Sequence, residues 1–198
     1  MKIIEVLLVF TVLAFGETVE LDPVGDTYTI PAGGCFGSLN ELDIANKPSA
    51  GHPDERTMIL WDTSEYDGRV VNSGTLKINS FFVCPSGEGT YTEIYAVTQS
   101  WDESWSGTHV SHASEPVVSY HFLGTGWHEV DVTALVSQWL SGGQENFGLV
   151  IQVSGVYPYT KFRSRETGST GPVLEIVLQQ QALEAVSWAG VKSCFKED

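Results

Sequence analysis

The chain has 198 residues, of which 42% are hydrophobic and 11% aromatic, a composition typical of a globular domain rather than a disordered segment. Its 10 basic and 25 acidic residues give a formal net charge of −15. Such a surface disfavours nucleic acid and anionic lipid as partners, because phosphate binding requires Lys and Arg side chains. The same repulsion disfavours a polyanionic glycan unless a local basic patch overrides it.

The N-terminus resembles an export signal. Met1-Lys2 precedes an apolar run over residues 3–15, and Ala14-Phe15-Gly16 supplies small residues for cleavage. We therefore predict a signal peptide over residues 1–16 and a secreted protein, extracellular or on the cell surface, with no membrane contact after cleavage. A buried first strand or a membrane anchor is the alternative, although the run is shorter than the roughly 18–20 residues that span a bilayer.

Short runs with period-two alternation, separated by Gly, Pro and Ser, predict about nine strands. In the run 74–83, Leu76 and Ile78 share one face, while Lys77 and Asn79 share the other. This pattern predicts an all-β fold, an antiparallel jelly-roll β-sandwich with one short helix. The expected strands are 26–30, 57–61, 74–83, 92–97, 117–122, 128–132, 148–153, 160–163 and 173–178.

The predicted helix covers residues 134–140. Thr133 is placed to cap its first turn and Gly142-Gly143 to end it. Its apolar residues recur at helical spacing: Leu135, Val136, Trp139 and Leu140. We expect the helix to close one end of the sandwich, with Trp139 in the core rather than on a ligand-binding surface.

The predicted domain covers residues 17–178, since the strand pattern ends there. Residues 179–198 then form a Gln-rich linker and a short amphipathic tail. In an oxidising compartment Cys35 and Cys84 can pair, which leaves Cys194 single in the tail. The sequence alone leaves both pairing and free thiols open.

Several motifs occur in a recognisable order: Asp26-Thr27-Tyr28, Arg56 to Asp62, Trp101-Asp102-Glu103, Trp127 to Thr133 running on to Asn146-Phe147-Gly148, and Phe162 to Glu166 followed by Gly171 to Leu174. Together they resemble the DNRLRE-domain family, which overlaps carbohydrate-binding module family 96 and is related to disaggregatase-type domains. The resemblance implies a jelly-roll sandwich that works beside cell-surface and polysaccharide-active proteins. The segment Ser104-Trp105-Ser106-Gly107 departs from the Thr-Trp-Asn pattern of the family, so that loop is altered.

The Ser-Arg-Glu segment supports two interpretations. Arg165 can pair with Glu103 or Asp131 at the end of the sandwich. The functional interpretation is a clamp for a glycan carboxylate. We favour a structural ion pair of Arg165, Glu103 and Asp131, because the family motif covers fold-defining positions rather than a cleft.

Four aromatic residues in or beside Gly- and Ser-rich loops are candidates for ligand binding, because the C–H faces of sugars stack on exposed rings. They are Trp105, Trp127, Tyr157 and Tyr159, and Arg163 lies close to the last of them. Each one alone is more often a packing residue, whereas the set indicates a binding face.

No metal site can be named from the sequence. The histidines have no metal-binding spacing and are expected to be solvated in loops: His52, His109, His112, His121 and His128. A structural calcium ion is common in jelly-roll modules, and acidic oxygens are plentiful, but no loop shows a regular acidic spacing. We expect no other cofactor.

Catalytic motifs are absent from the sequence, which has no nucleophile elbow, phosphate loop or dinucleotide fingerprint. We therefore predict a secreted non-catalytic carbohydrate-binding or cell-surface adhesion module. Its partner is a polysaccharide or cell-surface glycan, with other surface proteins also open. One alternative is a structural surface-layer or matrix domain without a small ligand. The other is a polysaccharide lyase or hydrolase, in which Tyr157, Tyr159 and Arg163 would carry the chemistry.

Overall fold

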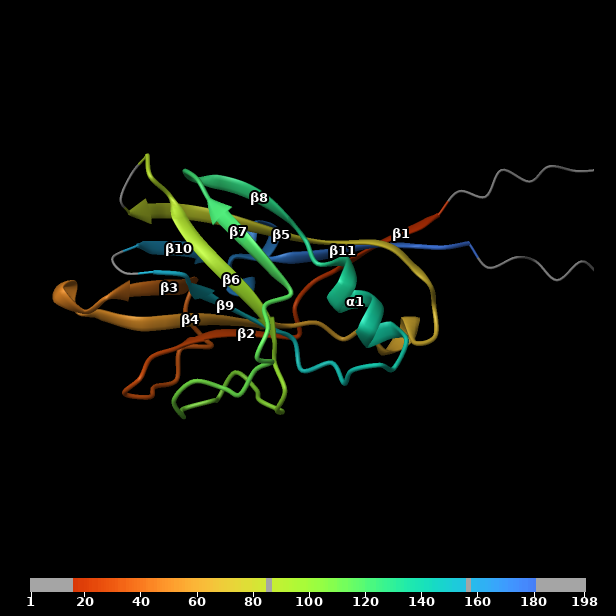
Figure 1. Cartoon of the computed structure of the whole chain (residues 1–198), viewed down its shortest axis with the longest axis horizontal. Helices are drawn as coiled ribbons and strands as arrows, with labels where there is room; N and C mark the ends of the chain where they lie inside the picture. The colour runs from red at the N-terminus through yellow and green to blue at the C-terminus, as the bar shows by residue number, and fades with distance from the viewer. Residues whose placement is uncertain (1–15, 85–86, 156–157, 181–198) are drawn as a thin grey trace, which may run out of the picture.

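Antiparallel strands form almost all the regular structure in the computed structural model, which describes residues 16–84, 87–155 and 158–180 (Figure 1). Within that part the fold has 11 strands and one short α-helix, which confirms the all-β prediction. The elements are β1 (Glu17–Leu21), β2 (Gly25–Thr29), β3 (Glu41–Lys47), β4 (His52–Leu60), β5 (Val71–Cys84), β6 (Thr90–Ala96), β7 (Val118–Phe122), β8 (Gly126–Asp131), α1 (Thr133–Leu140), β9 (Leu149–Val153), β10 (Tyr159–Arg163) and β11 (Val173–Leu178), with short 3₁₀ turns η1 (Pro48–Ala50), η2 (Ser64–Tyr66) and η3 (Arg165–Thr170).

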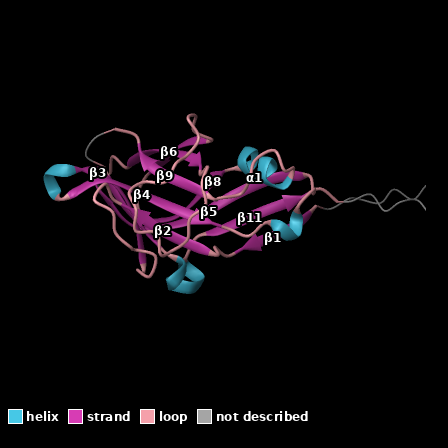
Figure 2. Cartoon of the chain, turned by 90° about the horizontal axis from the view of Figure 1, so that it is seen from below, coloured by secondary structure: helices cyan, strands magenta, loops and turns pink. Residues whose placement is uncertain are grey.

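The strands pair in the order β1-β11-β5-β10-β3-β4-β9-β6-β7, while β2 pairs with β4 and β8 with β5. The two long strands β4 and β5 each pair with three others, and so join the two layers of a β-sandwich. Figures 1 and 2 show the resulting layers, with α1 near the end from which both chain termini leave. The jelly-roll wiring stays a prediction.

The core follows the alternation of β5. Leu76 and Ile78 are fully buried between the layers, and Gly74 and Ser80 continue the same inward face. Burying one such aliphatic side chain contributes about 1.5–3 kcal/mol. The face predicted for Leu76 and Ile78 is therefore the core face.

Helix α1 packs on β5, where Gly74 permits a close approach, because a Cβ at this position would lie 2.8 Å from Val136. Trp139 is only 4% exposed, as predicted for a core residue. The predicted cap is wrong, since the cap position is Val132 and the side chain that caps is Asp131, whose Oδ1 accepts the Thr133 N–H at 2.9 Å. The helix ends before Gly142, which has the positive φ of 71° that glycine adopts readily.

Two strands were missed by the sequence pattern. Strand β1 is mostly exposed and pairs only along its edge with β11, so it has no buried period-two face. Strand β3 begins with acidic residues and contains Asn46, which is depleted in strands. Both form because neighbouring strands satisfy their backbone groups.

Of the two possibilities that the sequence left open for Cys35 and Cys84, the structure has the free thiols. Cys35 lies 3.4 Å from the backbone oxygen of Glu103, and Cys84 lies 3.8 Å from Lys47 Nζ. Cys194, the signal peptide and nearly all of the tail lie outside the described residues. No helix in the described segments has the length and apolarity needed to cross a membrane.

The prediction that the histidines are solvated in loops is wrong for several of them. His128 is buried in the core, 3.0 Å from Ser80 Oγ. His109 and His112, three positions apart in the sequence, both approach one ion pair. Arg56 donates to Asp54 at 2.8 Å, His109 lies 3.1 Å from the same carboxylate, and His112 lies 3.5 Å from the guanidinium. This cluster fixes the start of β4.

Candidate functional site

The outer face of β10 brings together two of the predicted ligand-binding residues. Thr160 and Phe162 point into the core and are fully buried, so the alternate residues of β10 lie on the opposite face. Backbone pairing places β3 on one side of β10 and β5 on the other. We call this surface the β10 face, and its residues are Glu41, Asp43, His52, Glu55, Phe81, Phe82, Tyr159, Lys161 and Arg163.

Aromatic rings occupy one end of the β10 face. Tyr159 is 8% exposed, its ring stacks on His52 with centroids 4.3 Å apart, and its hydroxyl donates to Asp43 at 3.1 Å. Phe82 lies against Tyr159 at 5.3 Å and is 42% exposed. Tyr159 is therefore a wall residue, whereas Phe82 presents its ring to solvent.

Lys161 is the centre of an internal charge network. Its Nζ donates to Glu41 at 2.6 Å and lies 3.4 Å from Asp43. Burial raises the pKa of Asp43, and the charge of Lys161 opposes that rise. Burial also opposes the charge on Lys161, yet its hydrogen bond to Glu41 holds the pKa of Lys161 above its ordinary value. The charge of Lys161 is thus already balanced within the protein.

Arg163 differs from Lys161 in having no internal partner. Its guanidinium carbon lies 4.3 Å from the centroid of the Phe81 ring. Glu41 stands opposite Arg163 in the strand register, but the carboxylate of Glu41 accepts from Lys161. Among the described residues, no carboxylate lies within ion-pair distance of Arg163. Its planar set of donors remains available to a ligand.

Neighbours of Tyr159 on this face were missed by sequence reasoning. Phe81 and Phe82 share the outer face because a bulge in β5 interrupts the pairing opposite Lys161 and Phe162. The double Phe breaks period-two alternation in the run 74–83, and that break was the available signal. His52 comes from a distant strand and gave no local signal.

The remaining candidates lie on other elements. Trp127 is 51% exposed on β8, opposite Asn79 of β5. Trp105 lies in the loop between β6 and β7, where its indole N–H donates to the Thr108 oxygen at 2.7 Å and its ring lines a shallow cavity of about 450 Å³. Tyr157 lies outside the described residues.

The predicted ion-pair residues are also separated. Arg165 Nη1 lies 3.1 Å from Glu103 Oε1, with both side chains about one-third exposed. Asp131 takes no part in this pair, because its carboxylate accepts from the backbone and hydroxyl of Thr133. The prediction that Asp131 pairs with Arg165 is therefore wrong, because β8, the strand that carries Asp131, ends beside α1.

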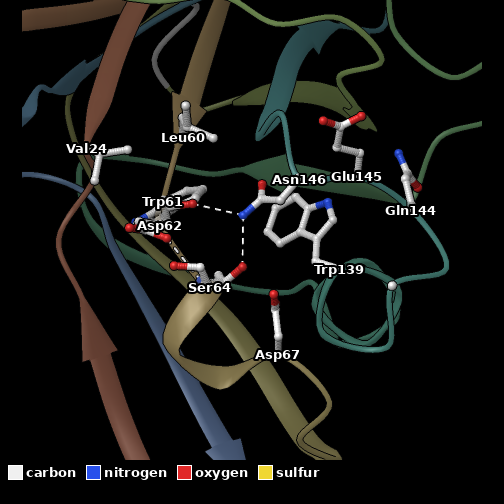
Figure 3. Close-up of a pocket in the computed structure, with 12 residues that line it drawn as sticks. Val24, Leu60, Trp61, Asp62, Ser64, Asp67, Trp139, Gln144, Glu145 and Asn146 are labelled. Atoms are coloured by element: carbon white, nitrogen blue, oxygen red, sulfur yellow. Dashed lines mark hydrogen bonds between the residues drawn. The ribbon is translucent and has the colours of Figure 1, made fainter.

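A cavity of about 650 Å³ lies beside α1 (Figure 3). Its polar groups mostly serve the fold. Asn146 donates to the Trp61 oxygen at 2.8 Å and to Thr63 at 3.0 Å, and accepts the Gly148 N–H at 2.9 Å. Trp61 is fully buried, so it offers no ring face to a ligand. We call this cavity the α1 pocket.

The α1 pocket is acidic. Asp62, Asp67 and Glu145 line it, and no basic side chain does. Its lining therefore repels an anionic ligand, and the indole of Trp139 at its floor is only 4% exposed. The β10 face, with the exposed ring of Phe82 and the guanidinium of Arg163 on neighbouring strands, is better suited to binding a polar ligand that has an apolar side.

An antiparallel β-sandwich with rings and charged groups on an open sheet face is the arrangement expected of a ligand-binding module. Residues 17–178 match carbohydrate-binding module family 96, and the protein belongs to this family. It is thus a carbohydrate-binding module by family. No curated protein matches the chain with significance.

Proposed function

We propose that the protein is a non-catalytic module that binds a neutral polysaccharide chain across the β10 face, outside the cell. One observation carries the proposal, namely that Arg163 has no carboxylate partner in the described structure and packs on the half-buried ring of Phe81, next in the chain to the exposed ring of Phe82. Family membership supports a carbohydrate ligand. Kinship with the DNRLRE and disaggregatase-type domains, and a place beside other cell-surface proteins, belong to the same proposal.

The chemistry of the face suits a sugar chain. Phe82 offers a ring on which the C–H side of a sugar can stack. Arg163 offers paired donors to adjacent sugar hydroxyls, and its guanidinium carbon lies 4.3 Å from the centroid of the Phe81 ring. An open sheet surface accommodates the middle of a chain rather than only its end.

The charge of the face favours a neutral glycan. Glu41, Asp43 and Glu55 lie around the rings, and Lys161 balances only part of their charge. The net charge of −15 adds long-range repulsion of polyanions. An acidic polysaccharide would meet one unpaired cation on this face, Arg163.

Support for a non-catalytic role comes from the same contacts. Glycoside hydrolysis requires one carboxyl group as acid and a second as base or nucleophile. Here Glu41 and Asp43 both bind Lys161, so neither stands free for such a role. Burial raises the pKa of Tyr159 above its ordinary value, which opposes use of its phenolate as the base of a lyase.

Affinity electrophoresis against neutral and acidic polysaccharides tests the proposal. We expect retardation by at least one neutral polysaccharide, loss of that retardation in Arg163→Ala, and none of it lost in Trp127→Ala. Prolonged incubation should yield no reducing ends and no unsaturated products. Failure of every glycan to retard the protein would overturn the proposal and favour a matrix domain without a small ligand.

A further inference from the structure

Three carboxylates from segments that are far apart in the sequence converge at one point of the structure. Asp26 belongs to β2, Glu103 to the loop between β6 and β7, and Glu166 to η3. One oxygen of each lies within 4.8 Å of the others. Acidic side chains repel one another, so such convergence requires a compensating charge.

Asp26 shows that this compensation is incomplete. Its side chain is fully buried, and its Oδ2 accepts the backbone N–H of Arg165 at 2.7 Å. Its Oδ1 has no hydrogen-bond partner in the described structure. A buried carboxylate oxygen without a partner is costly, and it is an unused ligand atom within the cluster.

Arg165 supplies one positive charge to the cluster. Its guanidinium lies 3.1 Å from Glu103 and 3.5 Å from Glu166. When all three carboxylates are ionised, they outnumber this guanidinium by two charges. A divalent cation balances that difference.

We propose that Asp26, Glu103 and Glu166 bind a calcium ion. Calcium takes six to eight oxygen ligands at about 2.3–2.6 Å, so oxygens on opposite sides of the ion lie about 5 Å apart. The three carboxylates each place an oxygen within 4.8 Å of the others, so one ion can contact all of them. Three protein carboxylates suit calcium better than magnesium, which protein sites usually hold through one or two carboxylates. Water and backbone oxygens complete the shell.

The ion would add a further link between β2, the loop between β6 and β7, and η3. Glu103 already contacts the segment before β3 through its backbone. The Cys35 thiol donates to the backbone oxygen of Glu103, and a Cβ at Gly37 would lie 2.5 Å from that same oxygen. Asp26 also accepts from η3 through the Arg165 N–H. Calcium at this point is structural, and it lies apart from the β10 face, so it does not rest on the proposed function.

The pKa of Asp26 reflects its position in the cluster. Burial raises the pKa of Asp26 to about 7, the charges of Glu166 and Glu103 add to the rise, and the Arg165 N–H and guanidinium oppose it. Because the folded pKa of Asp26 exceeds its unfolded value, this group's contribution to stability falls as the pH rises from about 4 towards 7.

The direct test is calcium titration of the EDTA-treated full chain by calorimetry and thermal unfolding. We expect one site and a rise in Tm of about 5–10 °C when calcium exceeds its Kd about a hundredfold. The Trp101 ring would lie 3.9 Å from a Cβ at Gly25, and Glu103 3.4 Å from it. Terbium in the site should therefore emit on excitation of tryptophan, and calcium should quench that emission.

Matched variants locate the ion. Asp26→Asn and Glu166→Gln should each lower calcium affinity at least about tenfold, since each removes a charged ligand. Glu129→Gln, an exposed carboxylate on β8, is the control and should leave the affinity unchanged. If Asp26→Asn does not fold, Glu166→Gln carries the test, because Glu166 is 24% exposed.

Three outcomes would overturn this site. One is the absence of heat and Tm shift in the wild type at millimolar calcium, the weakest range of extracellular calcium modules. Another is an equal loss of affinity in Glu129→Gln, which would indicate diffuse binding to an acidic surface. The third is tighter binding of magnesium than of calcium.

Discussion

The β10 face and the α1 pocket differ in shape and in charge. In the α1 pocket, Asn146 donates its amide hydrogens to the Trp61 oxygen and the Thr63 hydroxyl, and no basic side chain lines the cavity. The indole N–H groups of Trp61 and Trp139 have no hydrogen-bond partner in the described structure, but both rings are buried. On the β10 face, Phe82 is 42% exposed and Arg163 has no carboxylate partner among the described residues. Side chains that are both unpaired and exposed, rather than a hollow as such, distinguish the surface that we propose for binding.

The largest expected effect separates scaffold from site. Trp139→Ala should reduce the free energy of unfolding by about 3–5 kcal/mol, because it removes a buried ring from the core. Urea denaturation measures this change. Glycan affinity should stay at the wild-type value where the variant is folded. A loss under about 1 kcal/mol would mean that the ring contributes little to packing and would favour the α1 pocket as a binding site.

Removing the unpaired guanidinium should affect binding more than stability. Arg163→Ala is expected to lower glycan affinity about 10- to 100-fold, because hydrogen bonds from a charged donor contribute about 1.5–3 kcal/mol. Calorimetry with the retained polysaccharide measures it, and the melting temperature should change little. Arg163→Lys keeps the charge without the planar donors, so full recovery of affinity in that variant would argue against paired hydrogen bonding.

Exposed rings on two surfaces provide a matched pair. Phe82→Ala on the β10 face should weaken glycan binding about tenfold, since ring stacking contributes about 0.5–1.5 kcal/mol beyond area burial. Trp127→Ala on β8 removes a ring of comparable exposure and should leave affinity unchanged. The reverse result, measured by the same calorimetry, would move the binding site to β8.

The smallest effect is expected in the α1 pocket itself. Glu145→Gln should change neither glycan affinity nor the free energy of unfolding by more than about 0.5 kcal/mol, as for most surface substitutions. Calorimetry and urea denaturation measure both quantities. A marked loss of glycan affinity in this variant would reverse the ranking of the two regions.

Local pattern determined much of the fold from sequence alone. Alternation in the run 74–83 correctly predicted which side of β5 faces the core, and helical spacing correctly predicted α1 and the burial of Trp139. These features are readable because side-chain direction repeats every two residues in a strand and every 3.6 in a helix. Strand β1 escaped prediction because it is short and its two inward residues, Val19 and Leu21, are only partly buried.

Sequence also determined part of the candidate site. Tyr159 and Arg163 lie on one face because both are odd-numbered positions of one strand, and the same logic includes Lys161. The sequence could not show that Lys161 is paired with carboxylates while Arg163 is not, because that difference depends on Glu41 and Asp43 of another strand.

Only the tertiary structure decided which distant residues meet. Asp26 and Glu103 are 77 positions apart, and Asp26 and Arg165 are 139 apart, yet they share one cluster. Strand order and register determine such meetings, and neither is encoded in the local period of any one segment. The sequence therefore determined the faces of the strands and the family of the module, while the packing of strands from opposite ends of the chain decided which charges are satisfied and which remain free to bind.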